Sequence, residues 1–482
     1  MSPFLVFSIV LGYFSVLILI SFLTSKNSDS QTFFTANRQS PWYLVAFGMV
    51  GASLSGVTFI SIPGEVGSSQ FSYFQIVLGY LLGYLVIGAV LIPLYYRLNL
   101  VSIYGYLEQR FGFWSYKTGA FFFLISRVIG ASFRLFLVAG VLQLAFFDAF
   151  EIPFWFTVMV AIVLIWVYTF RGGIKTIVWT DTLQTFFMLL SVVVSIHLIG
   201  EELGMSLGQL IDTVEESQYS RIFFWDETGN HFMKQFFSGV FIAIVMTGLD
   251  QDMMQKNLTC RNLKEAQKNM FWFTIILVLV NVLFLFLGAL LFIYAQQKGV
   301  AIPASTDDLY PVLALQHFNI VAAIVFLLGI TAAAYSSADS ALTALTTSFC
   351  VDFLGFSHGS QPDDRKTRIL VHFGFSVLLF LVILIFRALN DASVISSLFR
   401  AAGYTYGPLL GLFAFGMFNR ISIKDKWVPL VCLVCPLISY ILNINSKDWW
   451  GYEFGFEILI LNGLLTFIGL WLIRDKAAVT TA

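Results

Sequence analysis

Long apolar stretches follow one another along almost the whole chain, and short polar segments separate them. A helix needs about 20 predominantly apolar residues to cross the hydrocarbon core of a bilayer. Thirteen stretches meet this requirement, so the pattern predicts an all-α polytopic membrane protein with 13 spans. They lie at about 3–23, 41–63, 71–97, 117–146, 153–171, 176–199, 235–256, 268–296, 318–351, 369–388, 393–418, 427–444 and 455–474.

The composition agrees with a chain that is surrounded by lipid. Apolar residues make up 58% of the 482 residues and charged residues only 11%, whereas soluble domains carry about 25% charged residues. The 52 Phe and 11 Trp side chains could not all be buried in a soluble core of this length. A soluble enzyme, a nucleic-acid binder and a disordered chain are therefore excluded. The net charge of −1 suggests no polyanionic partner.

Positive charges are distributed unevenly between alternate loops. If the N-terminus lies outside, 19 of the 27 Lys and Arg side chains fall on inward segments, five on outward segments and three within spans. Cytoplasmic loops of membrane proteins carry an excess of Lys and Arg. We therefore expect the N-terminus outside, the C-terminus inside, and a location in the inner (cytoplasmic) or plasma membrane. The acidic outward segment 200–234 is interpreted as a solvated loop with a short surface helix.

Two of the predicted spans are interrupted near their middle. The second contains Gly51-Ala52-Ser53-Leu54-Ser55-Gly56, and the seventh runs into Thr247-Gly248-Leu249-Asp250-Gln251-Asp252. A glycine costs about 1 kcal/mol against alanine inside a helix, and unwound backbone is tolerated in a membrane only where it is buried in protein or lines a cavity. Close packing of small residues is the alternative for the second span. If the first span is set aside, the two interrupted spans begin two sets of five, and such a pair points to a transporter's binding site.

Hydroxyl groups and a carboxylate share the middle of the ninth span. Ala333, Ser336, Ser337 and Ser340 have the spacing of one helical face, and Asp339 lies beside them. Hard cations prefer oxygen ligands, so this face, opposite the carbonyls of a broken helix, is a candidate cation site. The alternative is a packing face whose hydroxyls bond to carbonyls four residues back. In the sixth span Asp181 could pair with Lys175 or Arg171, or add a second carboxylate near the serine face.

The fourth span carries two arginines, Arg127 and Arg134, seven residues apart on one stripe. By helical rise, Arg134 lies around mid-depth and Arg127 about 10 Å nearer the cytoplasm. An arginine at mid-depth must face the bundle interior and needs a partner, and its guanidinium matches a carboxylate bidentately. The partner is either a substrate carboxylate or an internal acid. For the internal ion pair the candidates are Asp181, Asp339 and Glu65.

Four ordered segments together resemble the sodium/solute symporter family, which includes sodium-coupled sialic acid, proline, galactose, iodide and monocarboxylate carriers. Arg171-Gly172-Gly173 through Val178-Trp179-Thr180-Asp181 with Gln184 is similar to the family's Gly-Gly…Trp-Thr-Asp…Gln segment. Ala333 through Ser340 is similar to its Ala-x-x-Ser-Ser/Thr-x-x-Ser segment. The other two are Asp250-Gln251 with Gln255-Lys256, where the family has Asp-Gln-x-x-x-Gln-Arg, and Gly407-Pro408-Leu409-Leu410-Gly411. Their order and spacing hold over roughly residues 5–475.

The resemblance implies a fold. It predicts an inverted five-plus-five helix repeat, a LeuT-like core, with one leading and two trailing helices. The chain would then be a single transmembrane domain, 1–482. Its parts would be a leading helix 3–23, a first repeat 41–199, a second repeat 235–418 and trailing helices 427–474.

The resemblance also implies sodium ions, one in the family as a whole and two in some members. The ligands of the first would be the carbonyls of Gly51, Leu54 and Ala333 and the hydroxyls of Ser336 and Ser337. The ligands of the second would be Asp181, Ser336 and Ser340. Asp339 would be a further ligand, at a position where a member of the family has serine. This additional carboxylate would strengthen a cation site or carry a proton instead.

The sialic acid carriers place an arginine at about the position of Arg134, where it holds the substrate carboxylate beside hydroxyls of the broken helix. The substrate-binding candidates are therefore Arg134, Ser53, Ser55 and Thr58, with Gln75, Arg400 and Tyr404 as weaker ones.

The favoured function is sodium-coupled secondary uptake of a small carboxylate-bearing solute by alternating access. The alternative is the same mechanism with a neutral sugar, amino acid or vitamin-like substrate. A membrane enzyme is a third class, but the five histidines are scattered and there is no nucleotide-binding motif, so no catalytic residue is predicted. Four cysteines show no metal-ligand spacing, and no obligate protein partner is expected.

Overall fold

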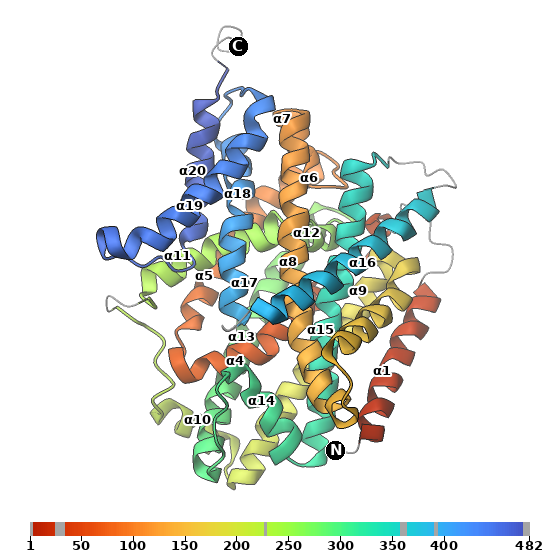
Figure 1. The fold of residues 1–482 in the computed structure, drawn as a ribbon, viewed down its shortest axis with the longest axis vertical. Coiled ribbons are helices and arrows are strands. Elements are labelled where there is room, and N and C mark those ends of the chain that lie inside the picture. Colours follow the sequence, from red (N-terminus) through yellow and green to blue (C-terminus); the bar gives the residue numbers. More distant parts are fainter. Residues whose placement is uncertain (1–2, 25–33, 226–228, 357–363, 390–393, 476–482) are drawn as a thin grey trace.

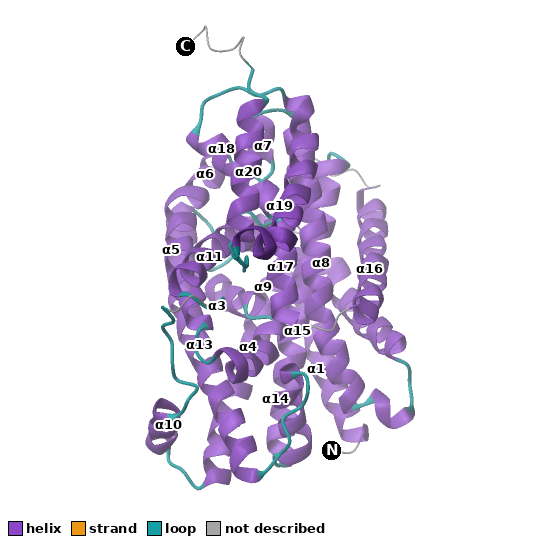
Figure 2. Cartoon of the chain, turned by 60° about the vertical axis from the view of Figure 1, so that its left-hand side comes forward, coloured by secondary structure: helices purple, strands orange, loops and turns teal. Residues whose placement is uncertain are grey.

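The computed structural model describes residues 3–24, 34–225, 229–356, 364–389 and 394–475. Long helices lie side by side along the long axis of the molecule, and shorter helices cross between them (Figures 1 and 2). The long helices are α1 (Pro3–Thr24), α8 (Phe113–Ala145), α9 (Phe154–Leu203), α13 (Leu263–Lys298), α15 (Ile320–Ser348), α16 (Asp364–Leu389) and α19 (Val428–Trp450).

Shorter helices complete the bundle. They are α3 (Trp42–Ser53), α4 (Gly56–Ser69), α5 (Tyr73–Val86), α6 (Ile92–Arg97), α7 (Gly105–Arg110), α10 (Leu207–Glu216), α11 (Phe232–Ala243), α12 (Gln251–Asn257), α14 (Leu309–Val312), α17 (Val394–Thr405), α18 (Gly407–Phe418) and α20 (Ile458–Leu472). The predicted surface helix in the acidic segment is confirmed as α10, which begins with a capping box formed by Ser206 and Gln209.

Within the described residues, eight helices are long and apolar enough to cross a membrane, and two bent helix pairs pass the same test when taken together. Three further expected spans coincide with shorter apolar helices, Phe154–Val167, Gly407–Phe418 and Ile458–Leu472. The all-helical membrane architecture is therefore confirmed, whereas the count of 13 spans is not, because length and composition support at most ten.

Both predicted interruptions are real breaks in the helices. Helices α3 and α4 meet at an angle of 55°, and the segment Phe232–Gly248 meets α12 at 68°. At the first break Leu54 and Ser55 leave the helical conformation, with ψ values of 37° and 179°. At the second, the side chain of Asp250 accepts hydrogen bonds from the backbone N–H groups of Asp252 and Met253 and so begins α12. The break positions follow from the glycines and the helix-capping aspartate that the sequence places there.

A third break separates two expected spans inside α9. Gly173 has φ 54° and ψ −150°, a conformation that residues with a Cβ avoid, and the helix changes direction there. The expected boundary between 153–171 and 176–199 is therefore confirmed at this glycine.

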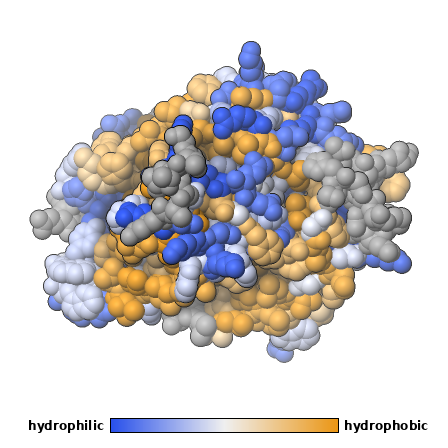
Figure 3. Space-filling view, turned by 90° about the horizontal axis from the view of Figure 1, so that it is seen from above, coloured by the Kyte–Doolittle hydropathy of each residue, from blue (hydrophilic) through white to orange (hydrophobic). Residues whose placement is uncertain are grey.

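Helices α15, α9, α8 and α3 pack against one another in the middle of the bundle. The first break also packs tightly, since a Cβ on Gly51 would lie 2.2 Å from the Thr185 hydroxyl oxygen on α9. Small-residue packing and unwinding, which the sequence offered as alternatives, therefore occur at the same place. Apolar side chains form much of the rim seen from the end of the bundle, and polar residues gather further in (Figure 3).

This close approach gives a testable prediction. Gly51→Ala should lower the melting temperature of the detergent-purified protein, because the new methyl group overlaps the Thr185 hydroxyl. The double variant Gly51→Ala/Thr185→Ala should recover part of the loss. Gly140→Ala is the matched control, because nothing lies within 4 Å of the Cβ position at this glycine of α8. Equal melting temperatures for both single variants would contradict the packing described.

Candidate functional site

A cavity of about 70 Å³ lies between the two broken helices. Ser53, Ser55 and Thr58 line it from the first break, and Met246 and Thr247 line it from the second. Arg127 and Arg134 of α8 also reach it. The structure therefore brings together four of the five predicted substrate-binding residues. The other lining residues are Ala52, Leu54, Val57, Tyr73, Tyr80, Tyr84, Ile242, Ala243, Met253, Leu277, Asn281, Leu398 and Phe399.

Gln75, the fifth predicted residue, lies elsewhere. Its amide nitrogen donates to the carbonyl of Asn230 at 2.9 Å, and its oxygen accepts from the backbone N–H of Phe224 at 3.1 Å. Gln75 therefore holds Phe224 and Asn230 against α5 and does not line the central cavity. Of the weaker candidates, Arg400 lines a separate, larger cavity, and the Tyr404 hydroxyl accepts a hydrogen bond from Asn443 at 2.6 Å.

The two arginines of α8 have different surroundings. The guanidinium of Arg127 forms an ion pair with Asp252 and lies 3.8 Å from the carboxylate of Asp250. Arg134 is 7% exposed, and its Nε has no hydrogen-bond partner. No ion pair links Arg134 to any acid within the described ranges, including Asp181, Asp339 and Glu65. Arg134 is thus a buried cation that faces the cavity without an internal counter-ion.

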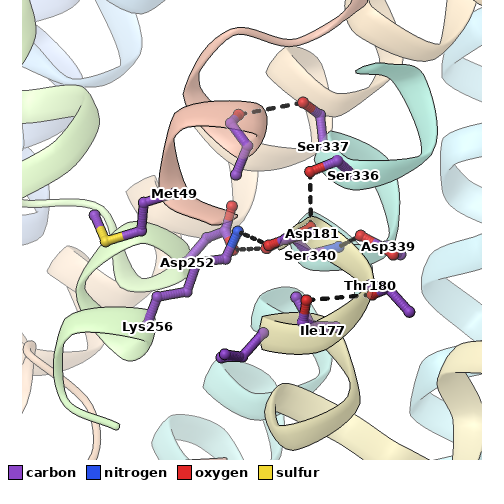
Figure 4. Close-up of polar contacts among 12 residues, drawn as sticks. Met49, Ile177, Thr180, Asp181, Asp252, Lys256, Ser336, Ser337, Asp339 and Ser340 are labelled. Carbon is purple, nitrogen blue, oxygen red and sulfur yellow. Dashed lines mark hydrogen bonds and ion pairs between the residues drawn. The ribbon is translucent and has the colours of Figure 1, made fainter. Parts of the chain in front are cut away.

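The serine face of α15 approaches the end of α3, as the cation-site hypothesis requires. The hydroxyl of Ser337 donates to the carbonyl of Ala52 at 3.2 Å (Figure 4). Because α3 ends at Ser53, its last carbonyls lack intrahelical donors and are available as ligands. Gly51 and Leu54 lie in the same turn and break as Ala52, and Ala333, Ser336 and Ser337 of α15 are buried.

Asp181 is buried beside this face. Its Oδ1 accepts a hydrogen bond from the Ser336 hydroxyl at 2.7 Å, and its Oδ2 lies 2.7 Å from the ammonium group of Lys256. The sequence suggested Lys175 or Arg171 as partners; the structure gives Lys256, although the side chain of Arg171 lies outside the described part. A hydroxyl that donates to a carboxylate keeps its lone pairs for a cation. Asp181 therefore orients the Ser336 hydroxyl.

The remaining predicted cation ligands make other contacts. The Ser340 hydroxyl donates to Asp252, and the Asp339 carboxylate accepts from the backbone N–H of Ser340 at 2.5 Å. The structure thus brings Asp181 and Ser336 together and directs the Ser340 hydroxyl toward α12.

Sequence reasoning missed the importance of α12. Its side chains Asp252 and Lys256 are 1% exposed and reach the serine face and Asp181 respectively (Figure 4). Asp250, just before α12, accepts a hydrogen bond from the Tyr406 hydroxyl at 2.5 Å. Two carboxylates and a lysine at spacing two and four after a helix break are the available signal, but the positive-charge count includes Lys256 among the 19 Lys and Arg of the inward segments.

These contacts form a closed layer on one side of the cavity. Arg127, Asp250, Asp252, Ser340 and Tyr406 join α8, α12, α15 and α17. On the other side lies a cavity of about 840 Å³ that shares Tyr73 and Phe399 with the central one. Helix α17 carries Arg400, which lines this larger cavity, and Tyr406 in the closed layer follows its last residue, Thr405. The central cavity thus adjoins the larger cavity at Tyr73 and Phe399, whereas ion pairs and hydrogen bonds of buried residues bound it at Arg127.

Comparisons with known proteins agree with this arrangement. The model of the sodium:solute symporter family matches residues 33–422. The chain belongs to the sodium:solute symporter family. It is 23% identical to the sodium/sialic acid symporter SiaT of Proteus mirabilis, over 96% of this chain and 95% of that one. It is 25% identical to the sodium/sialic acid symporter NanT of Aliivibrio fischeri, over 92% and 89%.

A multivitamin transporter from rabbit is 26% identical over 80% of this chain and 61% of its own length. Among solved structures, a substrate-bound, outward-open Na⁺-coupled sialic acid symporter superposes with a TM-score of 0.81 at 21% identity, covering 98% of this chain and 99% of that one. The nucleobase-cation symporter Mhp1 gives 0.59 at 15% identity, over 92% and 96%. The LeuT-like fold expected from the motifs is therefore confirmed, and the chain is a membrane symporter of small solutes.

The Arg127–Asp252 pair gives a prediction for the closed layer. Breaking a buried ion pair by removing one partner costs about 3–5 kcal/mol, because the other charge is left uncompensated. Arg127→Met and Asp252→Leu should therefore each destabilise the protein strongly, and the double variant should be less damaged than the sum of the two. Thermal unfolding of all four proteins in detergent measures this coupling. Additive losses would show that the two charges do not stabilise each other.

Proposed function

We propose that this symporter imports a small organic anion together with sodium, by alternating access. The observation that carries the proposal is Arg134, a buried cation that faces a cavity between two broken helices without an internal counter-ion. An isolated buried charge is costly, so a bound carboxylate would supply the interaction that the protein does not.

The contrast with Arg127 supports this role. Both arginines are buried on α8, but Arg127 has two carboxylates close by. A substrate carboxylate that approached Arg127 would have to displace Asp252. At Arg134 it would meet a planar guanidinium that can donate two parallel hydrogen bonds. The two relatives named above are sodium/sialic acid symporters, and sialic acid is a carboxylate.

The remainder of the cavity suits a polar organic body. Ser53, Ser55 and Thr58 present hydroxyl groups from the first break. Asn281 of α13 lines the cavity, and its side-chain oxygen has no hydrogen-bond partner, so it can accept from a hydroxyl or amide of the substrate. Tyr73, Tyr80 and Tyr84 add flat apolar surface.

Sodium would bind between the end of α3 and the serine face of α15. Its proposed ligands are the carbonyls of Gly51, Leu54 and Ala333 and the hydroxyls of Ser336 and Ser337. The contact between Ser337 and Ala52 supports this placement, because it shows that the two elements already lie within ligand distance of each other. Sodium bound there would hold α15 against the broken helix that also lines the substrate cavity.

During transport, the closed side of the binding site would open and the open side would close. The repeats proposed for residues 41–199 and 235–418 would rock so that the layer around Arg127 and Asp252 opens while Tyr73 and Phe399 close. We place the open cavity outside, with the N-terminus outside and the C-terminus inside, in the inner or plasma membrane. The start of α1 and the end of α20 lie toward opposite ends of the molecule, which supports this orientation (Figure 1).

Ser337→Ala tests the sodium site. The change removes one of five proposed ligands, so the sodium concentration for half-maximal uptake into proteoliposomes should rise, while the amount of folded protein stays the same. Ser348→Ala is not a suitable control because its hydroxyl binds Asp352; Ser8→Ala on α1, whose hydroxyl bonds only to Phe4 four residues back, is. Unchanged sodium dependence in Ser337→Ala would overturn the ligand assignment.

Arg134→Ala tests the substrate anchor. Hydrogen bonds to a charged group contribute roughly 1.5–3 kcal/mol, and 1.4 kcal/mol corresponds to a factor of ten. The variant should therefore bind a carboxylate substrate at least about tenfold more weakly by calorimetry in sodium buffer. Arg134→Lys should recover only part of the affinity, because the bidentate geometry is lost.

The ligand offers a matched control. With N-acetylneuraminate as the first probe, its methyl ester should bind the parent protein weakly, and Arg134→Ala should weaken the ester no further. Arg387→Ala, which removes an exposed cation that lies over Phe154, should change nothing. If Arg134→Ala binds the acid as tightly as the parent does, the substrate anchor is wrong and a neutral substrate is favoured.

A further inference from the structure

The place expected for a second sodium ion lies between Asp181 on α9 and the hydroxyls of Ser336 and Ser340 on α15. We propose that the ammonium group of Lys256 fills this place as a tethered cation, so that a single sodium ion accompanies each substrate. The inference rests on the proposed sodium-coupled function and concerns its stoichiometry. It also gives Lys256 a role that the segment Asp250-Gln251 with Gln255-Lys256 does not by itself indicate.

The geometry around Lys256 is that of a cation at a carboxylate. Its Nζ lies 2.7 Å from Asp181 Oδ2, and both side chains are almost completely buried, at 2% and 1% exposed. Lys256 belongs to α12, beyond the second helix break, and extends toward Asp181 beside the serine face (Figure 4). The ammonium group makes no well-directed hydrogen bond to a described residue, so it acts there as a positive charge.

The other expected ligands of a second sodium ion donate their hydroxyl hydrogens to carboxylates that are already paired with cations of the chain. Ser340 donates its hydroxyl to Asp252, and Asp252 is the ion-pair partner of Arg127. Ser336 donates to the remaining oxygen of Asp181. Two cations supplied by the chain thus neutralise two of the carboxylates around the serine face. A sodium ion would have to displace Lys256 to reach Asp181.

Stability alone does not explain why Lys256 is buried as part of an ion pair. Replacing a buried ion pair by apolar side chains of similar volume is often neutral or stabilising. A charge kept in this position is explained if Asp181 must stay ionised to orient Ser336, which is a proposed ligand of the first sodium ion. Lys256 would keep Asp181 ionised while the layer around Arg127 and Asp252 is closed, whether or not sodium is bound.

The experiment measures how steeply sodium alone stabilises the purified protein. Each bound ion adds one increment of stabilisation per tenfold rise in sodium above its dissociation constant. In the parent protein the stabilisation per decade of sodium should correspond to one ion. Lys256→Met removes the charge but keeps the length of the side chain, so sodium should enter beside Asp181 and the slope should double. Choline chloride at equal ionic strength is the control for general salt effects.

A double variant separates occupancy from damage to the fold. Asp181→Asn/Lys256→Met removes both charges, and its slope should return to one ion. In proteoliposomes, sodium-dependent uptake by the parent should have a Hill slope of one, and Lys256→Met should raise that slope toward two. If Lys256→Met does not fold, Lys256→Gln takes its place, and the parent measurement still decides.

Two sodium ions per substrate in the parent protein would overturn the inference while leaving the proposed symport intact. A slope that stays at one ion in a folded Lys256→Met protein would also overturn it, and Lys256 would then be structural only. Absence of any sodium-dependent stabilisation or uptake in the parent would instead contradict the proposed function itself.

Discussion

Charge neutralisation in the interior of the bundle is the constraint on which the rest of the structure depends. Water is scarce between packed membrane helices, so each buried ion must find a partner of opposite sign. Asp181 has Lys256, and Asp252 has Arg127, and these pairs fix where α12 lies relative to α8 and α9. Arg134 differs from Arg127 and Lys256, because the cavity that it faces is lined by hydroxyl, amide, aromatic and aliphatic groups and by no carboxylate among the described residues. Arg127 and Lys256 are paired with acids of the chain, whereas Arg134 is left to bind a ligand.

The broken helices make this charge pattern useful. A continuous helix presents only side chains, whereas the end of α3 also presents carbonyl groups, and the start of α12 presents a carboxylate cap. The sodium and substrate sites proposed above therefore meet at the same break, since the Ala52 carbonyl accepts a hydrogen bond from Ser337 while Ser53 and Ser55 line the cavity. Binding of either ligand restricts the same few residues. Coupling between the two sites then requires no long pathway.

Hydrophobic length and local motifs predicted much of this arrangement. Periodicity predicts the helices and the surface helix α10. The cost of polar groups at membrane depth predicts the breaks at Ser53–Gly56 and Leu249–Asp250 and the distinct position of Arg134. Contacts between distant segments did not follow. Nothing local in the sequence indicates that Lys256 meets Asp181, 75 positions earlier in the chain, or that the Gln75 side chain binds the loop at Asn230. Counting by positive charges also treated Lys256 as a loop residue, because the rule does not distinguish a solvated lysine from a buried one.

Ser336 lies between the proposed sodium site and the Asp181–Lys256 ion pair, because its hydroxyl donates to Asp181. Its hydroxyl hydrogen points to Asp181, so its lone pairs remain available to the sodium ion proposed to bind near the end of α3. That hydrogen bond is strongest while Asp181 is ionised, and the proposed role of Lys256 is to favour the ionised form. If α12 moves when the closed layer opens, Lys256 would move with it, and the ion pair between Lys256 and Asp181 would weaken. The affinity for sodium would then fall on the side of the membrane where sodium must be released, which is the direction that uptake requires.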